Sequence, residues 1–180
     1  MSKKYSIIYA DPPWDYNGQK QHRGKGTGGK DSGGAETHYP CMKLRQLKLM
    51  RVPEIAEDDC LLFMWATSPH LDQAIELMKS WGFDYKTIGF VWNKERVNPG
   101  FYTMSQVEIC IIGKKGKIPS PRGARNVRQY LKEMRGKHSS KPEEVRKRID
   151  KMFPYQQKVE LFARTKSQGW DSWGNDVGTS

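Results

Sequence analysis

The chain has 180 residues, of which 36% are hydrophobic, and it carries a formal net charge of +11 with a sequence pI of about 9.6. A chain of this length buries roughly 70% of its extended surface, so one domain over residues 1–180 needs no disulfide or metal to fold. Three widely spaced cysteines and four scattered histidines argue against a disulfide framework and a metal site, and no apolar stretch suggests a signal core or a membrane span. We therefore expect a cytoplasmic protein without a membrane partner, whose charge favours a polyphosphate such as nucleic acid.

Five strands and two helices are predicted in chain order. Apolar, β-branched and aromatic runs of strand length occupy residues 5–10, 60–67, 85–93, 107–113 and 158–164. Between them, apolar side chains recur at helical spacing in residues 69–81 and 142–153. This alternation predicts an α/β sheet with helices on both faces, and ligands of such sheets bind beyond the carboxyl ends of the strands.

Two basic segments interrupt this pattern. Residues 17–37 are rich in glycine and predict a long mobile loop, whereas residues 114–137 have early prolines and predict one short helix near 127–134. Both lie between predicted strands, so we interpret them as insertions within one domain that bind nucleic acid. The candidate phosphate contacts in them are Lys25, Lys30, Arg122 and Arg125. The alternative is a basic surface that only keeps the protein in solution.

The first predicted strand ends at Asp11-Pro12-Pro13-Trp14. A carboxylate in this place lies at the mouth of the sheet, and two prolines fix φ and remove two backbone donors, so that carbonyl groups are left as acceptors. This arrangement fits the exocyclic amine of a base, held by Asp11 and the Pro12 carbonyl with its ring stacked on Trp14. The alternative is a strand end whose tryptophan packs in the core.

These residues resemble a known family. Asp11-Pro12-Pro13-Trp14 looks like the DPPW motif of the MT-A70 adenine N6-methyltransferases, and the other matching segments follow in the family's order: THYPCM (37–42), the stretch from LLFMWATSPH to GFVWNK (61–94), HSSKPEEV (138–145) and KVELFARTKSQGWDSWGND (158–176). The resemblance covers nearly the whole chain. It implies a class I, Rossmann-like methyltransferase sheet in the permuted β-type motif order, in a bacterial or phage-infected cell. We expect a minimal sheet of about six strands, which a homodimer could complete.

The resemblance also implies S-adenosylmethionine as the methyl donor. Lys141 precedes Pro142 at the start of the second predicted helix, where a cation is unfavourable unless an anion such as the methionine carboxylate compensates it. The alternative for Lys141 is an exposed side chain. For two further candidates the alternatives are that Glu160 pairs with a lysine and that Phe162 is part of the core. No glycine-rich DxFxGxG turn follows the last predicted strand. The cofactor residues implied are Asp11, Lys141, Glu160, Phe162, Arg164, Gly174 and Asn175.

The implied reaction is direct in-line transfer of a methyl group to N6 of a flipped-out adenine. Hydrogen bonds from both N–H groups to Asp11 and Pro12 would return electron density to the nitrogen, and neither a metal nor a covalent intermediate is needed. The catalytic residues implied are Asp11, Pro12, Pro13 and Trp14. The remaining substrate contacts expected are Tyr16, His38 and Tyr39, in which the tyrosines replace lost stacking.

Adenine in DNA is the expected substrate, because the chain is small and has no RNA-binding extension of the kind found in relatives that act on messenger RNA. Three alternatives stay open. The chain could methylate adenine in RNA, or it could be a non-catalytic nucleic-acid-binding subunit of a methyltransferase complex. The same class of motif also serves methylation of cytosine N4 or of a glutamine side chain.

Overall fold

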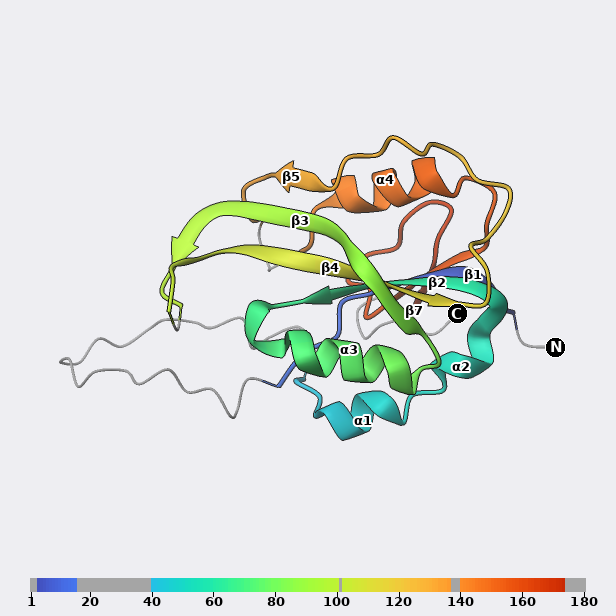
Figure 1. Cartoon of the computed structure of the whole chain (residues 1–180), viewed down its shortest axis with the longest axis horizontal. Coiled ribbons are helices and arrows are strands. Elements are labelled where there is room, and N and C mark those ends of the chain that lie inside the picture. Colours follow the sequence, from blue (N-terminus) through green and yellow to red (C-terminus); the bar gives the residue numbers. More distant parts are fainter. Residues whose placement is uncertain (1–2, 16–39, 101, 137–139, 174–180) are drawn as a thin grey trace.

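A mixed seven-stranded β-sheet is the middle layer of the computed structural model, which describes residues 3–15, 40–100, 102–136 and 140–173 (Figure 1). Its strand order is β5-β3-β4-β2-β1-β6-β7. The strands are β1 (Tyr5–Ala10), β2 (Ala56–Ala66), β3 (Asp84–Asn98), β4 (Ser105–Lys115), β5 (Tyr130–Lys132), β6 (Lys158–Leu161) and β7 (Asp171–Trp173). Only β4 is antiparallel to its neighbours among these pairs, so β1, β2, β6 and β7 end at the same edge.

The five strands predicted from the sequence are all present, but the expectation of about six strands is wrong. The described residues contain β5 and β7 in addition. Strand β5 lies where a short helix was predicted, because its three residues pair with Val91–Asn93 of β3 and only Leu131 is buried. With seven strands in place, a partner subunit is no longer needed to complete the sheet.

Helices cover both faces of the sheet, as predicted (Figure 1). They are α1 (Leu44–Lys48), α2 (Val52–Ile55), the 3₁₀ turn η1 (Ser68–His70), α3 (Leu71–Ser80) and α4 (Glu143–Met152). Helix α3 ends before Gly82, whose φ of 86° is the left-handed conformation that glycine adopts easily after a helix. None of the described helices is long and apolar enough to cross a membrane.

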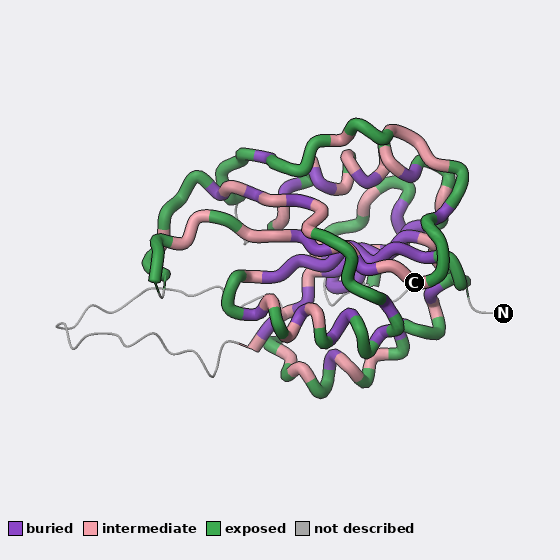
Figure 2. Tube along the Cα trace, in the orientation of Figure 1, coloured by how far each residue is buried: buried purple, intermediate pink, exposed green. Residues whose placement is uncertain are grey.

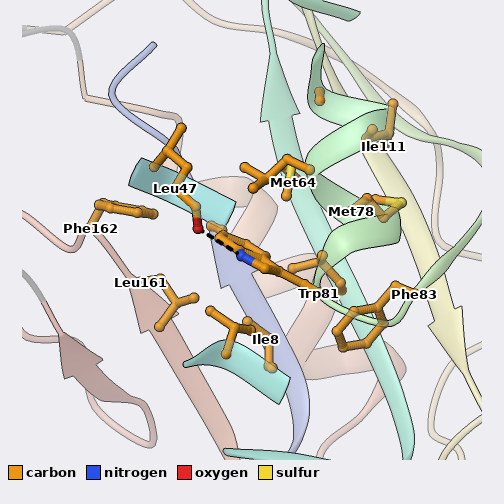
Figure 3. Packing of buried hydrophobic residues seen from close by; sticks show 14 of the residues in the cluster. Ile8, Leu47, Met64, Met78, Trp81, Phe83, Ile111, Leu161 and Phe162 are labelled. Carbon is orange, nitrogen blue, oxygen red and sulfur yellow. Dashed lines mark hydrogen bonds between the residues drawn. The ribbon is translucent and has the colours of Figure 1, made fainter. Parts of the chain in front are cut away.

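The core has two halves, one on each face of the sheet, and buried residues follow the central strands (Figure 2). On one face, Trp81 packs among side chains of β1 and β2, and its Nε1 donates to the carbonyl oxygen of Leu47 at 2.9 Å (Figure 3). On the other face, Phe153 beside α4 packs among aromatic side chains from the strands. Because neighbouring strand residues point to opposite faces, Asp11 continues the α4 side of β1 on which Tyr9 lies.

Candidate active site

Asp11, Lys141 and Glu108 meet beyond the carboxyl end of β1. Asp11 follows β1 directly, and Lys141 stands two residues before α4. The Lys141 Nζ lies 3.3 Å from Asp11 Oδ1 and 2.8 Å from Glu108 Oε2. The side chains of Lys141 and Glu108 are only 16% and 13% exposed, so water screens these ion pairs weakly. The ion pair between Asp11 and Lys141 therefore links two segments that are far apart in the sequence, and the sequence analysis selected both of them.

A fourth charged residue extends this network into the neighbouring strand. Lys94 of β3 is buried, and its Nζ lies 3.3 Å from Glu108 Oε1. The charges thus alternate along Lys94, Glu108, Lys141 and Asp11. A buried ion costs several kcal/mol unless it is paired, so each of these residues depends on the next. The network is held in place by β3, β4, β1 and the segment before α4.

The network shifts the pKa values of Asp11, Lys141 and Glu108. Burial raises the pKa of Asp11 above its usual 3.8, and Glu108 acts in the same direction while Lys141 opposes it. Burial alone would lower the pKa of Lys141, but the attraction of Asp11 and Glu108 outweighs it and raises that pKa. For Glu108, burial acts upward, yet the two lysines hold its pKa below its usual 4.5. Lys141 and Glu108 are therefore charged near neutral pH, and Asp11 is the carboxyl group of the network that is most easily protonated.

The Pro-Pro turn presents a carbonyl group beside this carboxylate. The Trp14 backbone N–H donates to the Pro12 oxygen at 2.9 Å, and the Met42 N–H donates to the Pro13 oxygen at 2.9 Å. A carbonyl oxygen has two lone pairs, so Pro12 can accept one more hydrogen bond. Asp11 and Pro12 together therefore offer two neighbouring acceptors.

Trp14 lies inside the protein. It is 4% exposed, its Nε1 donates to the Trp65 carbonyl oxygen at 3.3 Å, and its ring stacks on His70 with centroids 5.8 Å apart. Trp14 therefore packs in the core, as the alternative interpretation of the sequence expected. Its contacts hold the motif against β2 and η1. An indole buried in this way offers little surface to a base, and its predicted stacking role stays a prediction.

A small cleft connects Asp11 and Lys141 to β6. Its volume is about 70 Å³, and it is lined by Tyr9, Asp11, Ser140, Lys141, Arg146, Glu160, Phe162, Arg164 and Thr165. Glu160 pairs with Arg146 at 2.7 Å, so its partner is an arginine of α4 and not the lysine considered above. Burial raises the pKa of Glu160, while Arg146 opposes that shift. The cleft combines cations and carboxylates and could hold a zwitterionic ligand.

Phe162 makes the turn that follows β6. Its φ is 60°, a left-handed conformation that is uncommon for a side chain of this size. The Ala163 N–H donates to the Trp173 oxygen at 3.0 Å, and the Phe162 ring lies edge-on to the Trp173 ring with centroids 5.4 Å apart. The chain thus forms a tight turn at the carboxyl end of β6 without the glycines that the sequence lacks there.

The structure places two of the predicted phosphate contacts far from this cleft. The Arg122 guanidinium lies over the Phe153 ring at 5.4 Å, and the Gly123 and Ala124 N–H groups donate to carbonyls of α4 at its carboxyl end. Helix α4 begins near Lys141 and runs away from it. The segment with Arg122 and Arg125 therefore lies toward the amino-terminal ends of the parallel strands, opposite the end at which Asp11 lies. The predicted residues that fall outside the described ranges are Tyr16, Lys25, Lys30, His38, Tyr39, Gly174 and Asn175, together with the segment 17–37.

Sequence reasoning missed Glu108, Lys94 and Arg146. A signal for Glu108 was present, because it is a lone charge among the apolar residues of its strand and lies on the side that carries core residues, whereas Lys94 is followed directly by Glu95 and Arg96. A charge such as Glu108 must be paired when it is buried, but the sequence does not show which residue is its partner. Within the described ranges, no group of three or more histidine, cysteine, aspartate or glutamate side chains could hold a metal ion.

A much larger hollow lies elsewhere. Its volume is about 850 Å³, it runs along β6 and β7 from Tyr5 to Trp173, and it shares no lining residue with the cleft at Asp11. It therefore does not contribute to the geometry of the charge network.

Comparisons with known proteins show which family the sequence resembles along its length. The MT-A70 family model matches residues 5–176. The chain is 51% identical over 183 residues to the Type II methyltransferase M.MunI of Mycoplasma sp, which covers 97% of this chain and 78% of that protein. It is 25% identical over 184 residues to the N(6)-adenosine-methyltransferase MT-A70-like protein of Drosophila melanogaster and 24% identical over 184 residues to the N(6)-adenosine-methyltransferase catalytic subunit METTL3 of Homo sapiens. Those two matches cover 97% of this chain but only 27% and 28% of the relatives.

Proposed function

The chain belongs to the MT-A70 family, and from this premise we propose that it transfers a methyl group from S-adenosylmethionine to N6 of adenine in DNA. The observation that carries the proposal is the Asp11 carboxylate, paired with Lys141 beside the free acceptor position of Pro12. The high identity to a Type II methyltransferase, a designation that belongs to DNA modification, favours DNA. The relatives named for adenosine are only 24–25% identical.

The adjacency of β1 and β6 supports the permuted class I arrangement and a single domain over 1–180. These strands are far apart in sequence but pair in parallel, with Ala10 opposite Leu161. The catalytic turn after Ala10 and the turn at Phe162 are therefore neighbours at one edge of the sheet. In this arrangement a methyl donor held by residues after β6 would lie beside an acceptor held by residues after β1.

The residues of the cleft fit the polar groups of S-adenosylmethionine. Lys141 and Arg164 are cations suited to a carboxylate, and Asp11 and Glu160 are carboxylates suited to an ammonium group or to ribose hydroxyls. Ligand pockets usually hold about 300–1,000 Å³, so a cleft of about 70 Å³ encloses only part of such a cofactor. When bound, the cofactor supplies an electrophilic methyl group.

The chain's own contribution is to prepare the amine. The N6 lone pair of adenine is delocalised into the ring, and two N–H hydrogen bonds to the Asp11 carboxylate and the Pro12 carbonyl make that nitrogen a better nucleophile. Asp11 must be ionised to accept, and Lys141 keeps it ionised and oriented. Turning the base out of a duplex costs a few kcal/mol, which the protein must supply through other contacts.

The test is methyl transfer from labelled S-adenosylmethionine to unmethylated plasmid DNA, to its denatured form and to RNA of the same sequence, followed by mass spectrometry of nucleosides. We expect N6-methyladenine in DNA, and Asp11→Asn should lower the rate about a hundredfold or more because the charged acceptor is lost. Asp84→Asn, at the exposed amino-terminal start of β3 and so at the opposite end of the sheet from Asp11, is the matched control. A different methylated nucleoside would overturn the proposal, and cofactor binding without any transfer would favour a binding subunit.

A further inference from the structure

Strands β3 and β4 continue together beyond the ends of the other strands and form an arm (Figure 1). Pairing jumps from Asn93–Val107 to Asn98–Ser105, so residues 94–97 stand opposite residue 106 alone. Within this bulge, Glu95 has a φ of 59° and its N–H is held by Asn93 Oδ1 at 2.9 Å. Bulges of this kind bend a pair of strands and fix the direction in which the outer part of the pair points.

The base of the arm is part of the candidate active site. Lys94 is the first residue of the bulge, and it is ion-paired at 3.3 Å with Glu108, which lies diagonally across on β4, opposite Trp92. Glu108 also holds Lys141, which holds Asp11. The direction of the arm is therefore set relative to the carboxylate that would receive the base.

The outer part of the arm exposes large apolar side chains. Val97 is 47% exposed, Met104 is 62% exposed and Tyr102 is fully exposed. Single exposed apolar residues are ordinary, but several at the end of one arm mark a contact surface. The exposed Arg96 lies among them in sequence, and Lys132 of the neighbouring strand reaches Glu95 at 2.7 Å. The contact surface thus combines apolar side chains with one exposed cation, Arg96, and one surface ion pair.

Duplex DNA matches this combination. The exposed Arg96 beside the tip and the net charge of +11 suit a polyanion, whereas a protein partner would call for an apolar surface with fewer charges around it. Proteins that open a duplex insert methionine or other apolar side chains between bases, and aromatic rings replace lost stacking. Met104 comes four residues before Glu108, and at the spacing of extended chain this is roughly 13 Å, which is comparable to the width of about 12 Å of the DNA major groove.

We propose that Tyr102 and Met104, at the tip of the arm, enter the base stack of duplex DNA and fill the space left by the adenine that turns toward Asp11. The inference rests on the proposed methyl transfer to DNA and adds the group that holds the duplex open. It makes these two side chains positioning residues for the target base. Their effect should depend on whether the adenine is paired.

The test uses oligonucleotide duplexes that carry the sequence found methylated in the plasmid experiment. One duplex is fully matched, and the other has an abasic site opposite the target adenine, which removes most of the cost of unpairing. For the combined variant Tyr102→Ala and Met104→Ala, we expect kcat/KM to fall at least about tenfold on the matched duplex and less than about threefold on the abasic one. Tyr155→Ala, an exposed aromatic in the loop after α4, should match the wild type on both.

Three results would overturn the inference. An unchanged rate on the matched duplex would show that the tip is not needed to open it. Equal losses on both duplexes, with a changed sedimentation mass, would identify the tip as a contact between copies of the chain. Absence of methyl transfer by the wild-type protein would remove the proposed function, and the role of the tip with it.

Discussion

Glu108 is the residue on which the charge network of the site depends, because it holds Lys94 on one side and Lys141 on the other. Glu108→Gln removes the anion between two largely buried cations, so we expect the free energy of unfolding to fall by about 3 kcal/mol. Urea denaturation measures this. The matched control is Glu95→Gln, whose ion pair with Lys132 lies at the surface and should contribute less than about 1 kcal/mol. Equal losses in the two variants would mean that the network is not structurally important.

Protonation of Asp11 should determine the low-pH side of the pH–activity profile. Its pKa is raised by burial and by Glu108 and lowered by Lys141, and only the ionised form can accept from the amine without competing as a donor. Activity should therefore be lost as the pH falls through a pKa above 3.8. In Lys141→Gln the attraction that favours ionisation is gone, so this limit should move to higher pH. Profiles of kcat against pH at saturating cofactor would show it, and an unmoved or lowered limit would contradict the pairing.

The sequence alone selected Asp11 and Lys141 as candidate site residues, because their local settings are unusual. Asp11 is a carboxylate between a strand end and two prolines, and Lys141 is a cation at the positive end of a helix. It did not identify Glu108 as their partner. The pairing is a contact between β4 and two segments far away in the chain, and nothing local records it. For Trp14, the motif was recognised in the sequence, but the sequence could not show that its ring is buried against His70, because that contact depends on tertiary packing.

At the level of elements, Trp81 ties α3 to α1. Its indole is fully buried, and Nε1 donates to the Leu47 carbonyl near the end of α1 (Figure 3). Trp81→Phe leaves that carbonyl without its donor and opens a small cavity, so the free energy of unfolding should fall by about 2–3 kcal/mol. Chemical denaturation tests this, with Tyr155→Phe as an exposed control. A loss below about 1 kcal/mol would show that the two helices are joined by other contacts.

Strands with a run of apolar residues were predicted well, whereas the three-residue strands β5 and β7 were not. Residues 5–10 form β1 as expected, because both faces of that strand are buried along most of its length and its sequence is almost entirely apolar or aromatic. Residues 130–132 form a strand in place of a predicted helix, because pairing with β3 outweighs the propensity of a segment this short. The sequence also could not show that β1 and β6 are neighbours, since that depends on how the whole sheet is ordered.

For the whole molecule, the distribution of charge predicts which cations contact DNA. The site and the arm lie at the carboxyl end of β1. Arg122 and Arg125 lie toward the opposite end of the strands, although the sequence predicted these two arginines as phosphate contacts. If DNA binds over Asp11, Arg96→Ala should reduce the slope of log Kd against log salt by about 0.9, the value for one phosphate contact, and Arg125→Ala should leave it unchanged. Fluorescence anisotropy with a labelled duplex at several salt concentrations measures both. An equal reduction in Arg125→Ala would show that the duplex also reaches the far end of α4, and the contact predicted from the sequence would then stand.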